Sequence, residues 1–137
     1  FAREVAARCR AAGALCMVGG DAALAHQSEA QGMQMTSAQL TGATRRPDFE
    51  WVGASCHTRA DLERAAELEL DYAVLGPVQP TASHPGVAAL GWETFHALTR
   101  ELSIPVVAIG GLDVDDMSAA RAAGAHGIAA IRSVWGH

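Results

Sequence analysis

Short apolar runs alternate with amphipathic segments along the whole chain. Six of these runs are four or five residues long and almost continuously apolar, a pattern typical of strands that are buried on both faces. Three of the six end directly at a glycine, which favours a turn. The predicted strands are residues 14–18, 32–35, 51–55, 72–75, 105–109 and 127–131.

The segments between the runs place small and apolar side chains on one helical face. Asp21 and Thr58 each precede such a segment, and both residue types cap helices because a side-chain oxygen accepts backbone N–H bonds. Thr58 with Asp61 also matches the capping-box pattern. Three aspartates between residues 113 and 116 place negative charge at a helix start. The predicted helices are residues 1–12, 21–30, 37–42, 58–70, 91–102 and 113–123.

This alternation predicts an α/β protein with a parallel sheet and right-handed crossovers. The spacing of the strand starts suits a (β/α)8 TIM-type barrel, in which every strand is followed by a helix. The chain has 137 residues. A complete barrel needs about 250 residues, with about 200 as the lower limit, so this chain is short by about two βα units.

Composition narrows the class of protein. With 50% hydrophobic residues, the whole chain, residues 1–137, is expected to form one domain. A net charge of −5 and a pI of 5.6 argue against nucleic acid or an anionic membrane as the main partner. No apolar run approaches the ~20 residues of a membrane span. Three cysteines without C-x-x-C spacing favour neither a disulfide framework nor a zinc site, so a cytoplasmic location is expected.

The loop at residues 76–86, GPVQPTASHPG, carries the most distinctive chemistry. It follows the predicted strand 72–75 and holds Thr81, Ser83 and His84 between prolines. In α/β proteins ligands bind at this carboxyl end of the strands. The chain contains no lysine, so it offers neither Schiff-base chemistry nor a lysine ammonium to hold a phosphate.

Four segments carry a family pattern: WVGASCHT (51–58), DYAVLGPVQPTASHPG (71–86), PVVAIGGLDVDD (105–116) and AHGIAAIRS (125–133). In this order and at this spacing they resemble the thiamine phosphate synthase/TenI family of (β/α)8 barrels. The resemblance implies that residues 14–18 form the third barrel strand and residues 127–131 the eighth, with the first two βα units missing. SHPG together with AIRSVW is most similar to the variant of this domain appended to Nudix (MutT-type) hydrolases.

The family reaction joins a pyrimidine pyrophosphate to a thiazole phosphate and releases pyrophosphate. The resemblance implies a thiazole phosphate site after the last two strands. An arginine at position 132, where the family usually has serine, either clamps phosphate through two N–H groups or blocks the pocket. The alternative for the two glycines is a purely structural turn. The implied phosphate-binding residues are Gly110, Gly111, Ile131, Arg132 and Ser133.

The resemblance also implies a pyrophosphate site in the loop after the strand at 72–75. Thr81, Ser83 and His84 match the family segment P-T-x-T-K, whose hydroxyls and lysine handle the pyrophosphate. An imidazole carries less positive charge at pH 7 than the lysine ammonium that it replaces, so weaker stabilisation of the leaving group is expected. In the alternative interpretation, the two hydroxyls only satisfy their own turn.

Magnesium is the cofactor that the family reaction implies. Family synthases place an Asn-Asp pair and a further aspartate where this chain has Gly19, Gly20 and Gln39, and Asp21 lies one residue further along. Mg²⁺ prefers carboxylate oxygens in octahedral geometry. Asp21 is therefore the remaining metal candidate, although it also matches a helix cap, and impaired synthase chemistry is expected.

Ser55 and His57 complete the candidate site. The resemblance matches Ser55 to a residue that lines the pyrimidine site, and His57 to the histidine assigned to proton transfer in TenI-type thiazole tautomerases. That chemistry needs a general acid or base and no metal. The alternative for His57 is a local hydrogen bond to a neighbouring loop. Cys56 is expected to be a small buried hydrophobe rather than a nucleophile.

Together these patterns predict a thiamine-biosynthesis barrel that binds a small phosphorylated thiazole or pyrimidine. Its reaction is either an impaired synthase coupling or thiazole tautomerisation, and His57 fits both subfamilies. The alternative is a non-catalytic ligand-sensing or structural module fused to a Nudix hydrolase. An incomplete barrel exposes strand edges and apolar surface. A homo-oligomer or a longer Nudix-containing chain is therefore expected.

Overall fold

The computed structural model describes residues 1–135 and contains one six-stranded parallel sheet whose strands follow one another in chain order. At least one helix separates each strand from the next, which confirms the predicted alternation. The strands are β1 (Met17–Gly19), β2 (Gly32–Met35), β3 (Trp51–Cys56), β4 (Tyr72–Leu75), β5 (Val106–Ile109) and β6 (Gly127–Ala129). The helices are α1 (Ala2–Ala11), α2 (Ala22–Gln27), α3 (Ser37–Gly42), α4 (Arg59–Glu67), α5 (Gly91–Thr99), the 3₁₀ helix η1 (Val114–Asp116), α6 (Met117–Ala122) and α7 (Arg132–Trp135).

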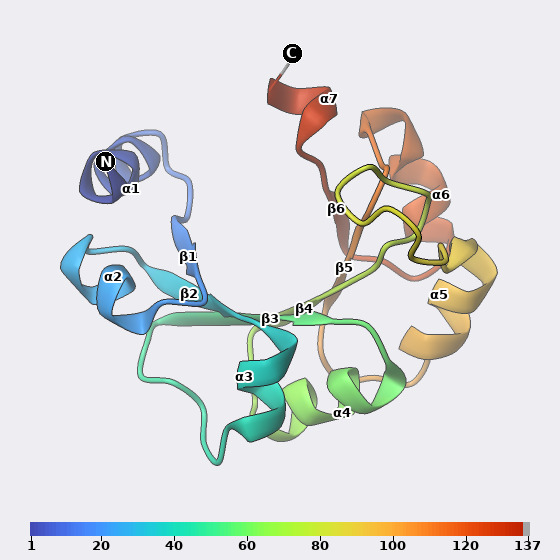
Figure 1. Ribbon diagram of the computed structural model, residues 1–137, viewed down its shortest axis with the longest axis horizontal. Coiled ribbons are helices and arrows are strands. Elements are labelled where there is room, and N and C mark those ends of the chain that lie inside the picture. Colours follow the sequence, from blue (N-terminus) through green and yellow to red (C-terminus); the bar gives the residue numbers. More distant parts are fainter. Residues whose placement is uncertain (136–137) are drawn as a thin grey trace.

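The sheet is curled, and the helices between its strands lie on its outer side (Figure 1). Strands β1 and β6 form its two edges, and no ladder joins them within residues 1–135. The open side faces the gap between α1 and α7. The result is a parallel α/β half barrel, which agrees with the predicted barrel class.

The core lies between the outer face of the sheet and the helices. Successive strand residues point to opposite faces, and in β3 the alternate residues Val52, Ala54 and Cys56 are at most 1% exposed. They belong to the same buried cluster as Leu62 of α4 and Phe95 of α5. Within the described part of the chain, no helix is both long and apolar enough to cross a membrane.

The observed ends of several strands and helices differ from the predicted ends. The strand predicted at 14–18 begins only at Met17, because its ladder with β2 contains only the three residues of β1. The last strand stops at Ala129 instead of residue 131, and α7 follows. The helix predicted over 113–123 is divided into η1 and α6, because Asp113 and Asp116 form a capping box around a 3₁₀ turn.

The predicted helix caps are confirmed. Asp21 Oδ1 accepts the N–H of Leu24 at 2.9 Å. Thr58 Oγ1 accepts the N–H of Asp61 at 3.1 Å, and Asp61 Oδ2 accepts the N–H of Thr58 at 3.2 Å, as a capping box requires. Asp61 Oδ2 also accepts the N–H of His57 at 2.9 Å. The cap of α4 therefore fixes the backbone of a predicted site residue.

An ion pair ties the amino ends of β3 and β4 together. Arg46 Nη2 donates to Asp71 Oδ2 at 2.7 Å, and the same oxygen accepts the N–H of Val52 at 2.7 Å. The two charged side chains are only 27% and 29% exposed. Arg46 also donates to three backbone carbonyls, those of Phe49, Glu50 and Glu69. The pair thus holds the loop before β3 against the turn before β4.

Replacing Asp71 with alanine is expected to lower the free energy of unfolding by about 1–3 kcal/mol, because two charge-assisted hydrogen bonds are lost. Urea denaturation followed by circular dichroism measures this change. Glu4→Ala is the matched control, since its ion pair with Arg8 is largely exposed and is expected to change stability by about 0.5 kcal/mol or less. Equal effects of the two substitutions would contradict the prediction.

Candidate functional site

A cavity of about 470 Å³ opens at the carboxyl ends of β3 to β6. Its walls come from the end of β3, the loop after β4, the turn after β5 and the start of α7. All ten residues predicted for catalysis or phosphate binding line it: Ser55, His57, Thr81, Ser83, His84, Gly110, Gly111, Ile131, Arg132 and Ser133. Asp21 is not among the lining residues. The structure brings the ten residues together, and their chemical roles stay predictions.

The turn after β5 lies directly against the loop after β4. Gly110 has φ of 108°, a left-handed conformation that favours glycine. A Cβ at this position would lie 2.5 Å from Pro77 Cα. The Val78 N–H donates to the Ile109 carbonyl at 2.9 Å, and the Gln79 N–H donates to the Gly110 carbonyl at 3.0 Å. Gly110 is therefore required by the packing of the turn, as the alternative of a purely structural turn predicted. The same close approach also forms one wall of the cavity.

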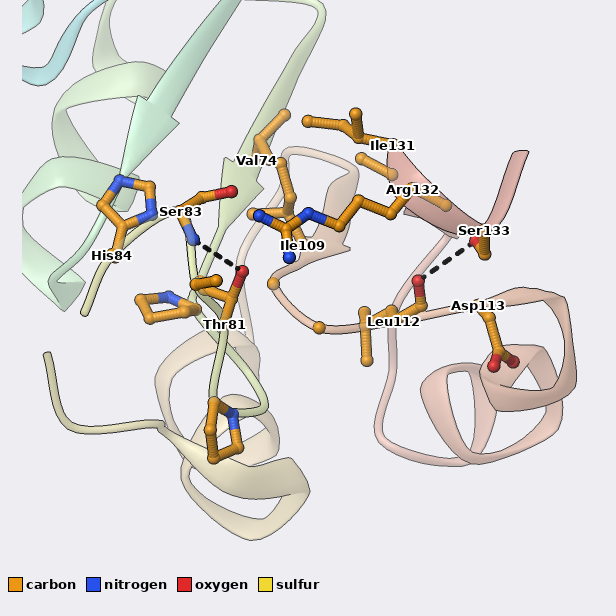
Figure 2. Close-up of a pocket in the computed structure, with 18 of the residues that line it drawn as sticks. Val74, Thr81, Ser83, His84, Ile109, Leu112, Asp113, Ile131, Arg132 and Ser133 are labelled. Carbon is orange, nitrogen blue, oxygen red and sulfur yellow. Dashed lines mark hydrogen bonds between the residues drawn. The ribbon is translucent and has the colours of Figure 1, made fainter. Parts of the chain in front are cut away.

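The loop after β4 is partly held by its own hydrogen bonds. The Ser83 N–H donates to Thr81 Oγ1 at 3.3 Å, and the His84 N–H donates to the Thr81 carbonyl at 3.3 Å. Figure 2 shows Thr81 and Ser83 facing each other at the cavity. Thr81 therefore serves its own turn as an acceptor, which supports the local interpretation, while its O–H can still donate to a ligand.

The opposite wall carries the positive charge. The Arg132 side chain extends from α7 toward the side of the cavity formed by Thr81 and Ser83 (Figure 2). Ser133 Oγ donates to the Leu112 carbonyl at 3.5 Å, which connects α7 to the loop after β5. Asp113 also lines the cavity, but its Oδ1 accepts the Asp115 N–H at 2.8 Å as the cap of η1. Arg132 is thus the one arginine among the lining residues.

His57 is oriented by the neighbouring loop. Its Nδ1 lies 3.2 Å from the Gly76 carbonyl oxygen. Because a carbonyl only accepts hydrogen bonds, Nδ1 must carry the proton in this contact, and Nε2 of a neutral ring is left with a free lone pair. The contact matches the predicted local role of His57. It also produces the tautomer that a general base at the cavity wall requires.

Cys56 lies between Ser55 and His57 but is 1% exposed. Burial, and to a smaller extent the negative charge of Asp61, raise the pKa of its thiol to about 12. A thiol with this pKa stays protonated near neutral pH, and the thiolate is the nucleophilic form. Cys56 is therefore a core residue beside the site.

The residues at the implied magnesium positions do not fit a magnesium site. Asp21 uses its carboxylate to cap α2, and Gln39 completes the capping box of α3 and donates through Nε2 to the Gly20 carbonyl at 2.9 Å. Among residues 1–135 there is no group of three or more His, Cys, Asp or Glu side chains arranged to hold a metal ion. One carboxylate and one amide, both engaged in helix caps, are too few oxygen donors for Mg²⁺.

Sequence reasoning did not single out Gln34 of β2 or Tyr72 of β4. Gln34 Nε2 donates to Ser55 Oγ at 3.2 Å, and Tyr72 Oη donates to Gln34 Oε1 at 2.6 Å. A signal was present, because Gln34 is a polar residue within an apolar run and shares the alternation of the residues on the inner face. The register that connects it to Ser55 becomes visible only in the structure.

Comparison with known proteins agrees with the resemblance found in the sequence. Residues 1–134 match the family described as thiamine monophosphate synthase. The chain is 35% identical to the thiamine-phosphate synthase of Thioalkalivibrio sulfidiphilus, covering 98% of this chain and 65% of that protein. It is 30% identical to the thiamine-phosphate synthase of Bacillus thuringiensis, covering 98% of this chain and 63% of that protein.

A solved structure agrees as well. The thiamine phosphate pyrophosphorylase from Pyrococcus furiosus superposes with a TM-score of 0.76 at 26% identity, covering 95% of this chain and 63% of that chain. The chain thus spans somewhat less than two thirds of the length of these relatives.

The buried thiol leads to a test. At pH 8 a thiol with a pKa of about 12 is ionised in only about one molecule in ten thousand. Iodoacetamide is therefore expected to alkylate Cys56 of the native chain at least ~100-fold more slowly than Cys56 of the urea-unfolded chain. Mass spectrometry of the Cys56 peptide measures both rates. Rapid alkylation of the native chain would identify an accessible thiolate and contradict the assignment of Cys56 to the core.

Proposed function

The chain belongs to the thiamine monophosphate synthase family, and from this premise we propose that its cavity binds a small phosphorylated thiazole. The observation that carries the proposal is the meeting of Arg132 and Ser133 with Thr81 and Ser83 around one cavity. A guanidinium, hydroxyl donors and backbone N–H groups are the groups that bind phosphate esters in proteins. A volume of about 470 Å³ is within the range of small-molecule sites.

The charges around the cavity favour a monophosphate. Arg132 is the one side chain in the lining that is always positively charged, and it forms no ion pair with any described residue. It is therefore available to bind two phosphate oxygens at once. A pyrophosphate carries more negative charge and would need further cations, so we propose that the Thr81–His84 loop contacts the ligand mainly through neutral hydrogen bonds.

For the reaction, we propose proton transfer on the thiazole ring with His57 as the general base. The contact between His57 Nδ1 and the Gly76 carbonyl supports this role, because it leaves Nε2 free to take a proton from one ring position and return it at another. Neither step needs a metal ion or a leaving group. The chemistry therefore depends only on groups that line the cavity.

We propose that coupling to a pyrimidine pyrophosphate is impaired. The family reaction uses Mg²⁺, and the residues at the matching positions, Gly19, Gly20 and Gln39, supply no carboxylate. From the same resemblance, we propose that β1 to β6 correspond to strands three to eight of a complete barrel. His84 at the position of the family's lysine also supports impaired coupling, because a departing pyrophosphate is stabilised by cations.

The rival proposal is a non-catalytic sensing module, which could be part of a longer chain that contains a Nudix hydrolase. It requires the same phosphate contacts but no function for His57 Nε2. Binding alone therefore does not separate the two proposals, and turnover does.

Titration of the chain with thiazole phosphate in a calorimeter is expected to show binding. Arg132→Ala should weaken that binding by about 10-fold or more, because a bidentate charge-assisted contact is lost. Arg121→Ala is the matched control, since Arg121 is exposed on α6 and does not line the cavity. The absence of heat at millimolar ligand with a folded chain would remove the binding proposal.

Exchange of deuterium into thiazole carboxylate phosphate is expected with the wild-type chain and should fall by about 100-fold or more in His57→Ala. His96→Ala is the control, because His96 Nδ1 also lies near a carbonyl, that of Ala123 at 3.1 Å, but the residue is outside the cavity. Binding without exchange in the wild type would favour the sensing module. Rapid Mg²⁺-dependent formation of thiamine phosphate would contradict the impaired coupling.

A further inference from the structure

Three polar side chains on adjacent strands form a hydrogen-bonded row on the inner face of the sheet. Tyr72 of β4 donates to Gln34 of β2, and Gln34 donates to Ser55 of β3. Ser55 lines the cavity, whereas Gln34 and Tyr72 are not among the lining residues. The row therefore reaches a ligand only through the hydroxyl of Ser55.

The contact between Tyr72 and Gln34 exists because Gly53, on the strand between them, has no side chain. Gln34 pairs in register with Gly53, and Gly53 pairs with Tyr72. A Cβ on Gly53 would lie 2.2 Å from Tyr72 Cζ and 2.5 Å from Gln34 Oε1. The missing side chain thus leaves the space in which the phenol and the amide meet across β3. Ser55 follows two residues later, on the same face of the strand.

The lengths of the two bonds fix their direction. The contact of 2.6 Å between Tyr72 Oη and Gln34 Oε1 is a normal O–H···O length and is short for N–H···O, whereas 3.2 Å between Gln34 Nε2 and Ser55 Oγ suits an N–H donor. The amide nitrogen can only donate, so Ser55 Oγ accepts at this position. The hydroxyl proton of Ser55 is then available to the cavity.

We propose that Gln34 and Tyr72 are positioning residues, which hold Ser55 as a hydrogen-bond donor to an acceptor atom in the ring of the ligand. The inference rests on the proposed function, in which the ring is a thiazole and the acceptor is its unprotonated nitrogen. Because coupling to the pyrimidine is proposed to be impaired, Ser55 contacts the thiazole instead of the pyrimidine that the resemblance implied. The phosphate at Arg132 supplies affinity, and Ser55 distinguishes a ring with an acceptor from one without. A hydroxyl without this row would rotate freely and could present either its proton or its lone pairs.

Calorimetry with thiazole phosphate and with its thiophene counterpart, in which C–H replaces the ring nitrogen, tests the donor role. The wild type is expected to prefer the thiazole by about 10-fold, the size of one hydrogen bond. Gln34→Glu should abolish this preference, because a carboxylate only accepts and takes the Ser55 proton for itself. Ser55→Ala should abolish it as well.

Gln31→Glu is the matched control for the added charge. Gln31 lies three residues before Gln34, and its Oε1 accepts the Cys16 N–H at 3.0 Å, a role that a carboxylate keeps. The preference for thiazole should be unchanged in this variant. Two results would overturn the role of the row in holding Ser55 as a donor: Gln34→Glu keeps the preference, or the wild type binds the two compounds equally. Neither result would affect the proposed phosphate site.

A measurement without ligand separates the two proposals. Tyr72 is the only tyrosine of the chain, so tyrosine labelled with ¹³C at Cζ gives one NMR signal. This signal should move in Gln34→Glu and stay in place in Gln31→Glu. An unmoved signal in Gln34→Glu would overturn the row itself. If the signal behaves as expected but the wild type binds neither compound, the row exists and the proposed function is wrong. The assignment of Ser55 to a ligand would then be wrong as well.

Discussion

The parallel ladder from β2 to β6 is the constraint on which the other features depend. It places the carboxyl ends of β3 to β6 at one edge, and the side chains and loops that follow these four strands meet there around a cavity. The same register sets Gln34, Gly53 and Tyr72 in one line across the sheet. A slip of one residue would turn every strand side chain to the other face, and it would destroy the core and the site together.

Two glycines, Gly110 and Gly53, allow close approaches that form one wall of the cavity and the polar row that ends at Ser55. At Gly110 the turn after β5 packs against Pro77, and at Gly53 the missing side chain lets two polar groups meet. At these two positions, the structural role of the glycine and its contribution to the site are therefore compatible. The absent Cβ allows the packing at both positions, forms a cavity wall at Gly110 and lets Gln34 and Tyr72 meet at Gly53.

The sequence was sufficient to predict features that depend on local pattern, on the direction of the strands or on the family resemblance. The cap at Thr58, the strand at Tyr72 and the gathering of Thr81 with Arg132 follow from local pattern, strand polarity and family resemblance. The limits of β1 and β6 did not follow, because the ladders of these two edge strands are short. The bond between Tyr72 and Gln34 did not follow either, since it joins residues 38 positions apart through a register that no local pattern encodes.

The charges of the site support one consistent proposal. A synthase that expels pyrophosphate needs carboxylates to hold Mg²⁺ and cationic groups to stabilise the leaving group. The sequence resemblance matches Gly20 and Gln39 to two of the carboxylate positions and His84 to the lysine position, so it implies that both parts are altered together. Arg132 is the fixed positive charge in the lining, and it has no partner among the described ion pairs. The carboxylate in the lining, that of Asp113, caps η1. A site with one free cation and neutral hydrogen-bond donors matches a phosphate monoester, whose ring can then be recognised by Ser55 and acted on by His57.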